Sequence, residues 1–413
     1  MECAIRGLFV AVLTIKMRPK PSSAARRHAF LVANTAWGRV ADALGSMSLT
    51  VVCLILLMVV VVICTLAQVP LGTHVAVDRT IRTLFIRWFP AGGSVGIPVF
   101  PGGGFVGGLL LVNLLFAQFL RLERSRRKAG LWLAHLGLAL LFVGEFASSL
   151  FQVESRMPLQ IGQTGNFSED PQAMELAVID ASDPATDTVT SIPDSYLVPG
   201  TEVAAPSLPF KIAVRRRYAN SAIGTRGPSD GSPDATGGVG PGIVVSPRPT
   251  VASDDSQNSP AVLVEPIENG RSLGSFWVSN ALGAPQGFTR GARAWRLALR
   301  PRRYYLPFSL TLKEFHHDVY PGTDIPKNFS SLVGLVDSSR REDRDVTIRM
   351  NSPLRYGGRT FYQASFGMGD KLSVLQVVSN PGWLIPYLSC VFVSLGMLVH
   401  FAVKLGGALR GAP

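Results

Sequence analysis

The chain has 413 residues, of which 47% are apolar and only 16% are charged, and its formal net charge is +12. Apolar residues gathered in a few long blocks are typical of an integral membrane protein with one large polar region, not of two or three soluble domains. Much of the positive charge lies beside the apolar blocks, and no DNA- or RNA-reading motif accompanies it. We therefore expect a lipid bilayer, and no nucleic acid, as a partner.

The chemistry of common soluble enzymes is missing from the sequence. No CxxC or CxxCH occurs, which argues against a thioredoxin-like site, a zinc ribbon and a c-type haem attachment site within the chain. GxSxG, Walker A and HExxH motifs are also absent. The long polar region contains no cysteine, so disulfides cannot hold it together.

Four apolar blocks are long enough, or nearly so, to cross a bilayer as helices. We predict three N-terminal spans and one C-terminal span, at residues 46–69, 105–120, 130–151 and 383–403. Basic residues precede the first block, fill the loop 121–128 and follow the last block, which places these three segments in the cytoplasm. The predicted topology has both termini inside and residues 152–382 outside the cytoplasm.

This topology divides the chain into five segments. They are a basic cytoplasmic tail at 1–45, which we do not interpret as a cleaved signal, a three-helix transmembrane region at 46–151, an extracytoplasmic domain at 152–382, the fourth transmembrane helix at 383–403 and a cytoplasmic tail at 404–413. The expected location is the plasma membrane.

The extracytoplasmic domain is predicted to be β-rich. Short alternating stretches such as MELAVIDA, FKIAVRRRY and LSVLQVVS recur between Gly, Pro, Asn and Asp, as in a sandwich or barrel. Residues 219–257 are rich in Gly, Ser, Pro and Asp and hold few bulky side chains, so we predict a disordered insertion there. Before the second span, the stretch IRTLFIRWF is amphipathic and is expected at the outer interface.

Two histidines lie inside the predicted spans, where an ionisable side chain is costly and points to function. His135 follows Lys128 by seven residues and His400 precedes Lys404 by four, which puts them roughly 10 Å and 6 Å in from the cytoplasmic charges. If the third and fourth spans pack together, both imidazoles could face one cavity and provide the axial ligands of a haem iron. In the alternative interpretation, each imidazole is satisfied by a backbone carbonyl or by water.

The remaining histidines give weaker signals. His74 lies just outside the first span, on the opposite side of the membrane, and is a candidate for an outer haem site or relay; a solvated loop histidine is the alternative. His316 and His317 are neighbours on a predicted strand, so their side chains point to opposite faces and cannot chelate one metal ion. A structural role is expected for that pair.

Two runs in the chain resemble the ResB family of cytochrome c biogenesis proteins. The run FHHDVYPGTDIPKNFSSLVGLVD is similar to the family's F-x-x-D-x-Y-P-G-x-x-x-P-x-x-F-x-S segment, and NSPLRYGGRTFYQASFG, residues 351–367, to its N-x-P-L-x-Y-x-G-x-x-F-Y-Q-x-S-F/Y-G signature. The third span, WLAHLGLALLFVGEF, also resembles the family's histidine-bearing span. The likeness covers residues 46–170 and 300–405, and residues 175–300 match nothing in the family pattern.

The resemblance implies a role. ResB-like proteins work with a ResC/CcsA-type membrane partner, which carries a tryptophan-rich haem-handling motif, to move haem b outward and attach it to apocytochrome c. By this likeness, His135 is the first candidate ligand of the haem in transit and His400 the second. The haem is bound non-covalently, and the chain is expected to be an accessory subunit, not an enzyme.

Two other functions stay open. A haem-dependent transmembrane electron carrier would need a second histidine pair near the outer face, which His74 alone does not supply. A structural assembly factor would bind apocytochrome through the extracytoplasmic domain without touching haem.

Overall fold

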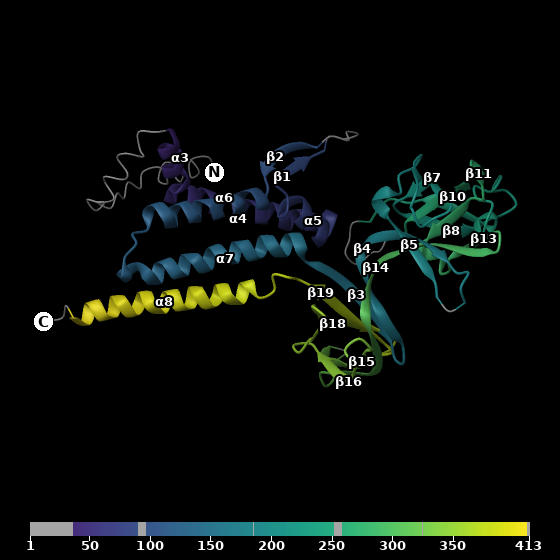
Figure 1. Cartoon of the computed structure of the whole chain (residues 1–413). Helices are drawn as coiled ribbons and strands as arrows, with labels where there is room; N and C mark the ends of the chain where they lie inside the picture. The colour runs from purple at the N-terminus through teal and green to yellow at the C-terminus, as the bar shows by residue number, and fades with distance from the viewer. Residues whose placement is uncertain (1–35, 90–95, 185, 252–257, 324, 411–413) are drawn as a thin grey trace. The chain divides into compact units, whose positions relative to one another are not determined.

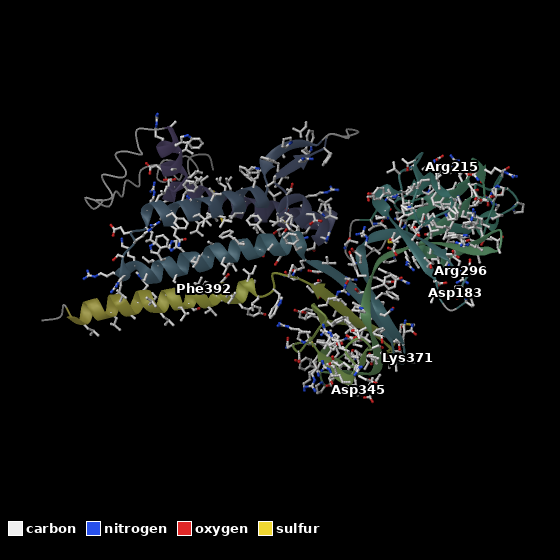
Figure 2. The ribbon with its side chains drawn as sticks, in the orientation of Figure 1. Asp183, Arg215, Arg296, Asp345, Lys371 and Phe392 are labelled. Atoms are coloured by element: carbon white, nitrogen blue, oxygen red, sulfur yellow. The ribbon has the colours of Figure 1, made fainter. Side chains whose placement is uncertain are left out.

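The computed structural model describes residues 36–89, 96–184, 186–251, 258–323 and 325–410. Its contacts divide the chain into two units (Figure 1). The helical unit comprises Met1–Cys64, Asp78–Val143 and Ile385–Pro413, and the β-rich unit comprises Thr65–Val77 and Gly144–Leu384. Nitrogen- and oxygen-bearing side chains are concentrated on the strands, whereas the long helices carry mostly hydrocarbon side chains (Figure 2).

Four helices in the described part of the chain are long and apolar enough to cross a membrane, as the sequence predicted. They are α4 (Met47–Leu71), α6 (Gly103–Phe116, continued by a π-helical turn at Ala117–Arg121), α7 (Ala129–Phe151) and α8 (Ile385–Arg410). Helix α8 runs further than predicted, into the segment that we expected to be a C-terminal tail. The described end of the predicted N-terminal tail forms helix α3 (Ala36–Leu44), and residues 1–35 and 411–413 lie outside the described residues.

Helices α7 and α8 make a backbone-to-backbone contact through glycine. A Cβ atom at Gly130 would lie 2.5 Å from the carbonyl oxygen of Gly396 and would also meet the backbone nitrogen of His400. A Cβ atom at Gly137 would lie 2.8 Å from the carbonyl oxygen of Ser389. Small residues allow this close approach, which is how van der Waals packing holds membrane helices together.

A buried asparagine connects α6 to the first helices of the chain. The side chain of Asn113 is 1% exposed, and it accepts a hydrogen bond of 2.6 Å from Thr50 Oγ1. Its amide group donates to the backbone carbonyls of Leu44 and Ser46. In an apolar environment such a group must be fully paired, so this network fixes where α4 begins against α6.

The segment before the second span contains a hairpin, and its position at the outer interface stays a prediction. Strand β1 (Phe85–Trp88) pairs with β2 (Ile97–Pro101), after the short helix α5 (Thr73–Thr80). The aromatic and β-branched residues that made this stretch look amphipathic also favour strands. Phe85 stacks on Phe105 of α6, so part of the apolar surface packs on the helix.

The β-rich unit is built on a 10-stranded antiparallel sheet, in agreement with the predicted class of fold. The strand order is β16-β15-β14-β4-β3-β19-β18-β17, with β13 pairing β14 and β5 pairing β4. The strands are β3 (Val153–Gln160), β4 (Thr164–Asp180), β5 (Thr188–Pro193), β13 (Gln286–Arg290), β14 (Arg293–Val319), β15 (Pro326–Asp337), β16 (Glu342–Arg349), β17 (Leu354–Tyr356), β18 (Arg359–Gly367) and β19 (Leu372–Ser379).

Two hydrophobic cores lie along this sheet. In the first, the sheet rolls so that β18 approaches β15 and β16, and it encloses side chains such as Leu310, Leu335 and Phe361. In the second, Leu297 and Leu299 of β14 pack against a five-stranded sheet. The strands of that sheet are β6 (Glu202–Val203), β7 (Lys211–Tyr218), β10 (Ala261–Glu268), β11 (Arg271–Ser272) and β12 (Phe276–Ser279).

The prediction of a disordered insertion at 219–257 is wrong for residues 219–251, while 252–257 lie outside the described residues. Strands β8 (Ser221–Thr225) and β9 (Ile243–Pro247) form a hairpin, and Ala235 packs in a small core beside Trp277. The segment needs few bulky residues of its own because Trp277 and its neighbours provide the apolar surface. Its glycines allow close approach: a Cβ atom at Gly237 would overlap the ring of Phe276.

The signature at residues 351–367 forms the hairpin of β17 and β18. Gly357 and Gly358 have φ values of 59° and 74°, the left-handed conformation that a two-residue hairpin turn requires. The Tyr356 hydroxyl donates to Asp337 Oδ2 at 2.9 Å, and Phe361 is fully buried. Gln363 bonds to Ser331 and Ser373 inside the sheet. These residues hold the rolled sheet closed.

The tyrosine of this hairpin makes stability sensitive to alkaline pH. Burial, together with hydrogen bonds to Glu342 and Asp337, raises the pKa of Tyr356 to about 12 from its ordinary value of 10. The folded state therefore favours the protonated hydroxyl, and its stabilising effect is complete below pH 10 and is lost as the pH rises toward 12. In Tyr356→Phe, we expect a smaller fall in the free energy of unfolding over this interval. Urea unfolding at several pH values would test this, and an unchanged slope would contradict it.

The glycine contact between α7 and α8 gives a second prediction. Gly130→Ala places a methyl group against the backbone of α8 and is expected to destabilise the protein by about 1–3 kcal/mol. The matched control is Gly406→Ala on α8, where a Cβ atom meets nothing within 4 Å. The measurement is unfolding in mixed detergent micelles, and equal stabilities of the two variants would argue against the contact.

Candidate functional site

His135 lies on α7, half-buried, and its ring is held by the helix itself. Nδ1 lies 2.8 Å from the carbonyl oxygen of Leu131, one turn earlier. Because a carbonyl can only accept, this bond places the proton on Nδ1 and leaves the lone pair on Nε2. A backbone bond of this kind is the usual way in which proteins orient a metal-binding imidazole. The backbone contact predicted by the alternative interpretation is therefore present, and it leaves the ligating nitrogen available.

His400 lies on α8 in a different environment. Its Nδ1 is buried and has no hydrogen-bond partner among the described residues. Its ring packs edge-on against Phe401, with 5.8 Å between the ring centroids. A buried imidazole nitrogen without a partner is unfavourable, so this side chain has hydrogen-bonding or ligating capacity that the described chain does not use.

His135 on α7 and His400 on α8 lie on adjoining helices, at different levels along the helix axis. Gly130 meets the backbone of His400, and Gly396 meets Ala134, which fixes the antiparallel register. His135 lies five residues beyond Gly130, so it is offset from His400 by roughly 7 Å along the axis. The backbone contact leaves no room for a porphyrin between the facing sides of the helices. The geometry thus offers two separate axial ligands, and the sharing of one iron stays a prediction.

His74 lies in the first turn of α5, within the β-rich unit, so it is not in a loop. The suggestion of an outer haem site stays a prediction, because His74 belongs to the β-rich unit, whereas His135 and His400 belong to the helical unit. Within the described residues, no group of three or more His, Cys, Asp or Glu side chains is arranged to hold a metal ion.

His316 and His317 point apart, as the strand pattern predicted. Nε2 of His316 lies 3.1 Å from Glu314 at the surface. His317 turns inward, with Nδ1 3.3 Å from Asp370 and its ring 4.3 Å from the ring of Phe366. His317 therefore packs with Phe366, whereas His316 forms a surface contact, and a structural role fits both.

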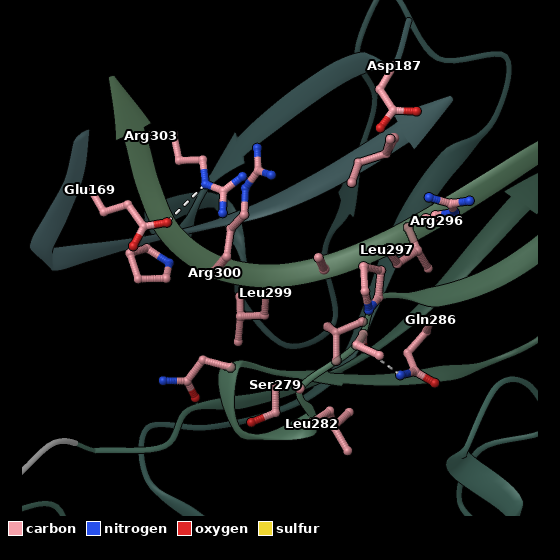
Figure 3. Close-up of a pocket in the computed structure, with 18 residues that line it drawn as sticks. Glu169, Asp187, Ser279, Leu282, Gln286, Arg296, Leu297, Leu299, Arg300 and Arg303 are labelled. Carbon is pink, nitrogen blue, oxygen red and sulfur yellow. Dashed lines mark hydrogen bonds and ion pairs between the residues drawn. The ribbon is translucent and has the colours of Figure 1, made fainter. Parts of the chain in front are cut away.

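A cleft along strand β14, which the sequence pattern does not predict, is shown in Figure 3. Strand β13 pairs with β14 only over residues 293–297, and β15 only from Ser309 onward. Among the described strands, none covers residues 298–308 on that side. A cavity of about 420 Å³ lies there, between β14 and the loop 279–286.

This cleft exposes main-chain groups and charge. Leu297 pairs with Gln286 of β13, so its main-chain groups face the β13 side of the strand. Because this orientation repeats every second residue, the N–H and C=O of Leu299 face the same side, where no strand covers them. Arg300 and Arg303 are neutralised by Glu175 and Glu169, at 2.9 and 3.0 Å. Arg296 has no acidic partner within the described chain. The cleft is therefore an open sheet edge with a weakly positive rim.

The comparisons with known proteins match parts of the chain. Residues 274–374 match the model of the ResB-like family. A stretch of 102 residues is 41% identical to protein NrfI of Wolinella succinogenes, which covers 25% of this chain and 11% of that protein. A stretch of 63 residues is 41% identical to the cytochrome c biogenesis protein CcsB of a Picosynechococcus species, covering 15% and 13%.

These relatives are therefore matched over a small part of their length. The segment matched by the family model contains most of the residues that line the cleft along β14 and both sequence motifs, whereas His135 and His400 lie outside it. The structure accounts for the second motif as the hairpin that closes the rolled sheet. Over this segment, and in agreement with the motifs read from the sequence, the chain is similar to the ResB-like family.

Proposed function

We propose that this chain acts in cytochrome c maturation, as a membrane subunit that holds haem on its way to apocytochrome c. The ResB-like segment supports this role, together with the relative named as a cytochrome c biogenesis protein. Four apolar helices support insertion in a bilayer. The basic segments that flank them favour cytoplasmic termini and an extracytoplasmic β-rich unit.

The observation that carries the haem part of the proposal is the orientation of His135. Its Nε2 lone pair is free because Nδ1 donates to Leu131, and imidazole nitrogen is a standard axial ligand of haem iron. Haem is cargo in this role: it binds non-covalently, and His135 keeps it oriented until it leaves. His400 or a ResC/CcsA-type partner provides the second ligand. We assign the attachment chemistry to that partner and not to this chain.

Loss of the imidazole tests this assignment. In His135→Ala, we expect the haem that co-purifies with the protein to fall at least tenfold, and added imidazole to restore part of it by entering the emptied position. The measurement is the absorption spectrum of the purified protein, normalised to protein. His316→Ala is the matched control, since its imidazole is exposed and contacts Glu314. Equal haem content in both variants would contradict the role of His135.

The cleft along β14 favours a second activity, the binding of apocytochrome as an extended chain. An uncovered sheet edge accepts a peptide as an added strand, through main-chain hydrogen bonds. Apocytochrome is unfolded before haem attachment, so its main-chain groups are free to pair. Pro301 interrupts the edge and limits such pairing to the neighbourhood of Leu299.

Hydrogen exchange distinguishes strand addition from other contacts. An extended peptide that contains a CxxCH segment is expected to slow exchange of the Leu299 amide, which faces the uncovered side. The same peptide with alternate backbone nitrogens methylated cannot form the ladder and should give no protection. The measurement is exchange followed by mass spectrometry, and equal protection by both peptides would show that the edge is not used.

A further inference from the structure

A second, smaller cavity lies in the β-rich unit and is not used by the role proposed above. Its volume is about 100 Å³, and it is lined by Val153, Ser155, Ser168, Tyr304, Arg359, Val377 and Ser379. These residues come from five strands of the rolled sheet. Val153 begins β3 just after α7, and Ser379 ends β19 a few residues before α8. The cavity therefore lies at the end of the sheet where the chain continues into two of the apolar helices.

Arg359 is the only charged group that lines this cavity, and it has no carboxylate partner within the described residues. Its sole hydrogen bond there is a long one, 3.5 Å from Nη1 to the carbonyl oxygen of Tyr305. Burial lowers the pKa of the guanidinium from its ordinary value, as expected for a desolvated cation. Partly buried arginines are normally paired. Because Arg359 makes one long hydrogen bond, most of its five N–H donors are left for a ligand.

The hydroxyl groups around Arg359 add further donors. Ser155 donates to Ser168 Oγ at 2.8 Å, or to the carbonyl of Val377. Ser168, which is 1% exposed, accepts that bond and keeps its own proton free. The hydroxyl of Ser379 has no partner within the described chain. The cavity therefore contains several free donors and no charged acceptor, a lining that suits an anionic group.

Nearby acidic groups do not oppose this conclusion. Tyr304 donates its hydroxyl proton to Asp170 at 2.8 Å, which turns that proton away from the cavity. Asp170 also accepts from the backbone N–H groups of Gln172 and Ala173, so its charge is compensated. Glu169 is paired with Arg303. The cation of Arg359 therefore stays uncompensated.

We propose that Arg359, Ser168 and Ser379 bind one carboxylate, and that this carboxylate is a propionate of the haem in transit. The inference rests on the proposed function, because it takes haem as the cargo. The cavity has room for a carboxylate group and not for a porphyrin, so the macrocycle would stay outside it. Arg359 would then act at a later station than His135, where haem leaves the helices for the partner or the apocytochrome. A planar guanidinium is well suited to a carboxylate because it offers two parallel N–H groups.

The test compares haemin with haemin dimethyl ester, in which both propionates are esterified. The full chain is placed in nanodiscs of phosphatidylcholine, and each ligand is titrated by absorption. A charge-assisted bond corresponds to a roughly 10–100-fold preference of the wild-type protein for the diacid. In Arg359→Gln we expect the preference to fall to within about threefold, and in Arg359→Lys to be partly kept. The ratio is measured on one preparation, so a partial loss of folded protein cancels.

Arg355→Gln is the matched control, because Arg355 lies on the same hairpin, outside the cavity, against Trp383. It should keep the wild-type ratio. A wild-type protein that binds both ligands equally, or an Arg359→Gln variant that keeps the preference, would overturn the inference while leaving the haem role intact. Wild-type protein that binds neither ligand would refute the haem role itself. Nanodiscs with phosphatidylglycerol that abolish the preference would identify a lipid phosphate as the occupant, and the propionate assignment would be wrong.

Discussion

The pairing of β14 with β4 is the interaction on which the β-rich unit depends. Strand β14 runs through both hydrophobic cores: Leu297 and Leu299 enter one core, and Leu310 and Leu312 enter the other, while β4 pairs with it from Trp295 to Thr311. No other strand joins the two cores in this way within the described sheet. Strand β4 covers one side of β14 for most of its length. An open edge can therefore occur only on the other side, where β13 and β15 pair with β14. The cleft beside Leu299 follows from the gap between β13 and β15.

In the helical unit the constraint is the glycine contact between α7 and α8. It brings two polypeptide backbones into van der Waals contact, so the facing sides of the helices are filled. Both histidines must then present their rings away from that contact. This explains how a span can carry an imidazole without a second ionisable group beside it: Nδ1 of His135 donates to the carbonyl of its own helix, and the lone pair of Nε2 stays available.

The sequence predicted the elements well wherever the pattern is long and local. The apolar blocks gave the four helices, and alternation gave the strand-rich class. It failed where neighbours distant in the chain decide the outcome. Residues 219–251 hold few bulky side chains, and they pack against Trp277 and Leu263, which lie later in the chain. The depth argument put His135 and His400 on one side of the bilayer, but their relative level depends on helix register, which Gly130 and Gly396 set. Hydrophobic periodicity carries no information on that register or on the cleft of β14.

The family signature separates residues that build the fold from residues that are free to act. Tyr356, Gly357, Phe361 and Gln363 each have a structural reason to be what they are: a buried hydrogen bond, a left-handed turn, a core position and a serine network. Arg359 lies among them with no such reason, since a neutral side chain would satisfy the same cavity without desolvating a charge. A costly group that the fold does not need is best explained by a ligand. The same reasoning applies to His135, whose place in an apolar helix the packing does not require.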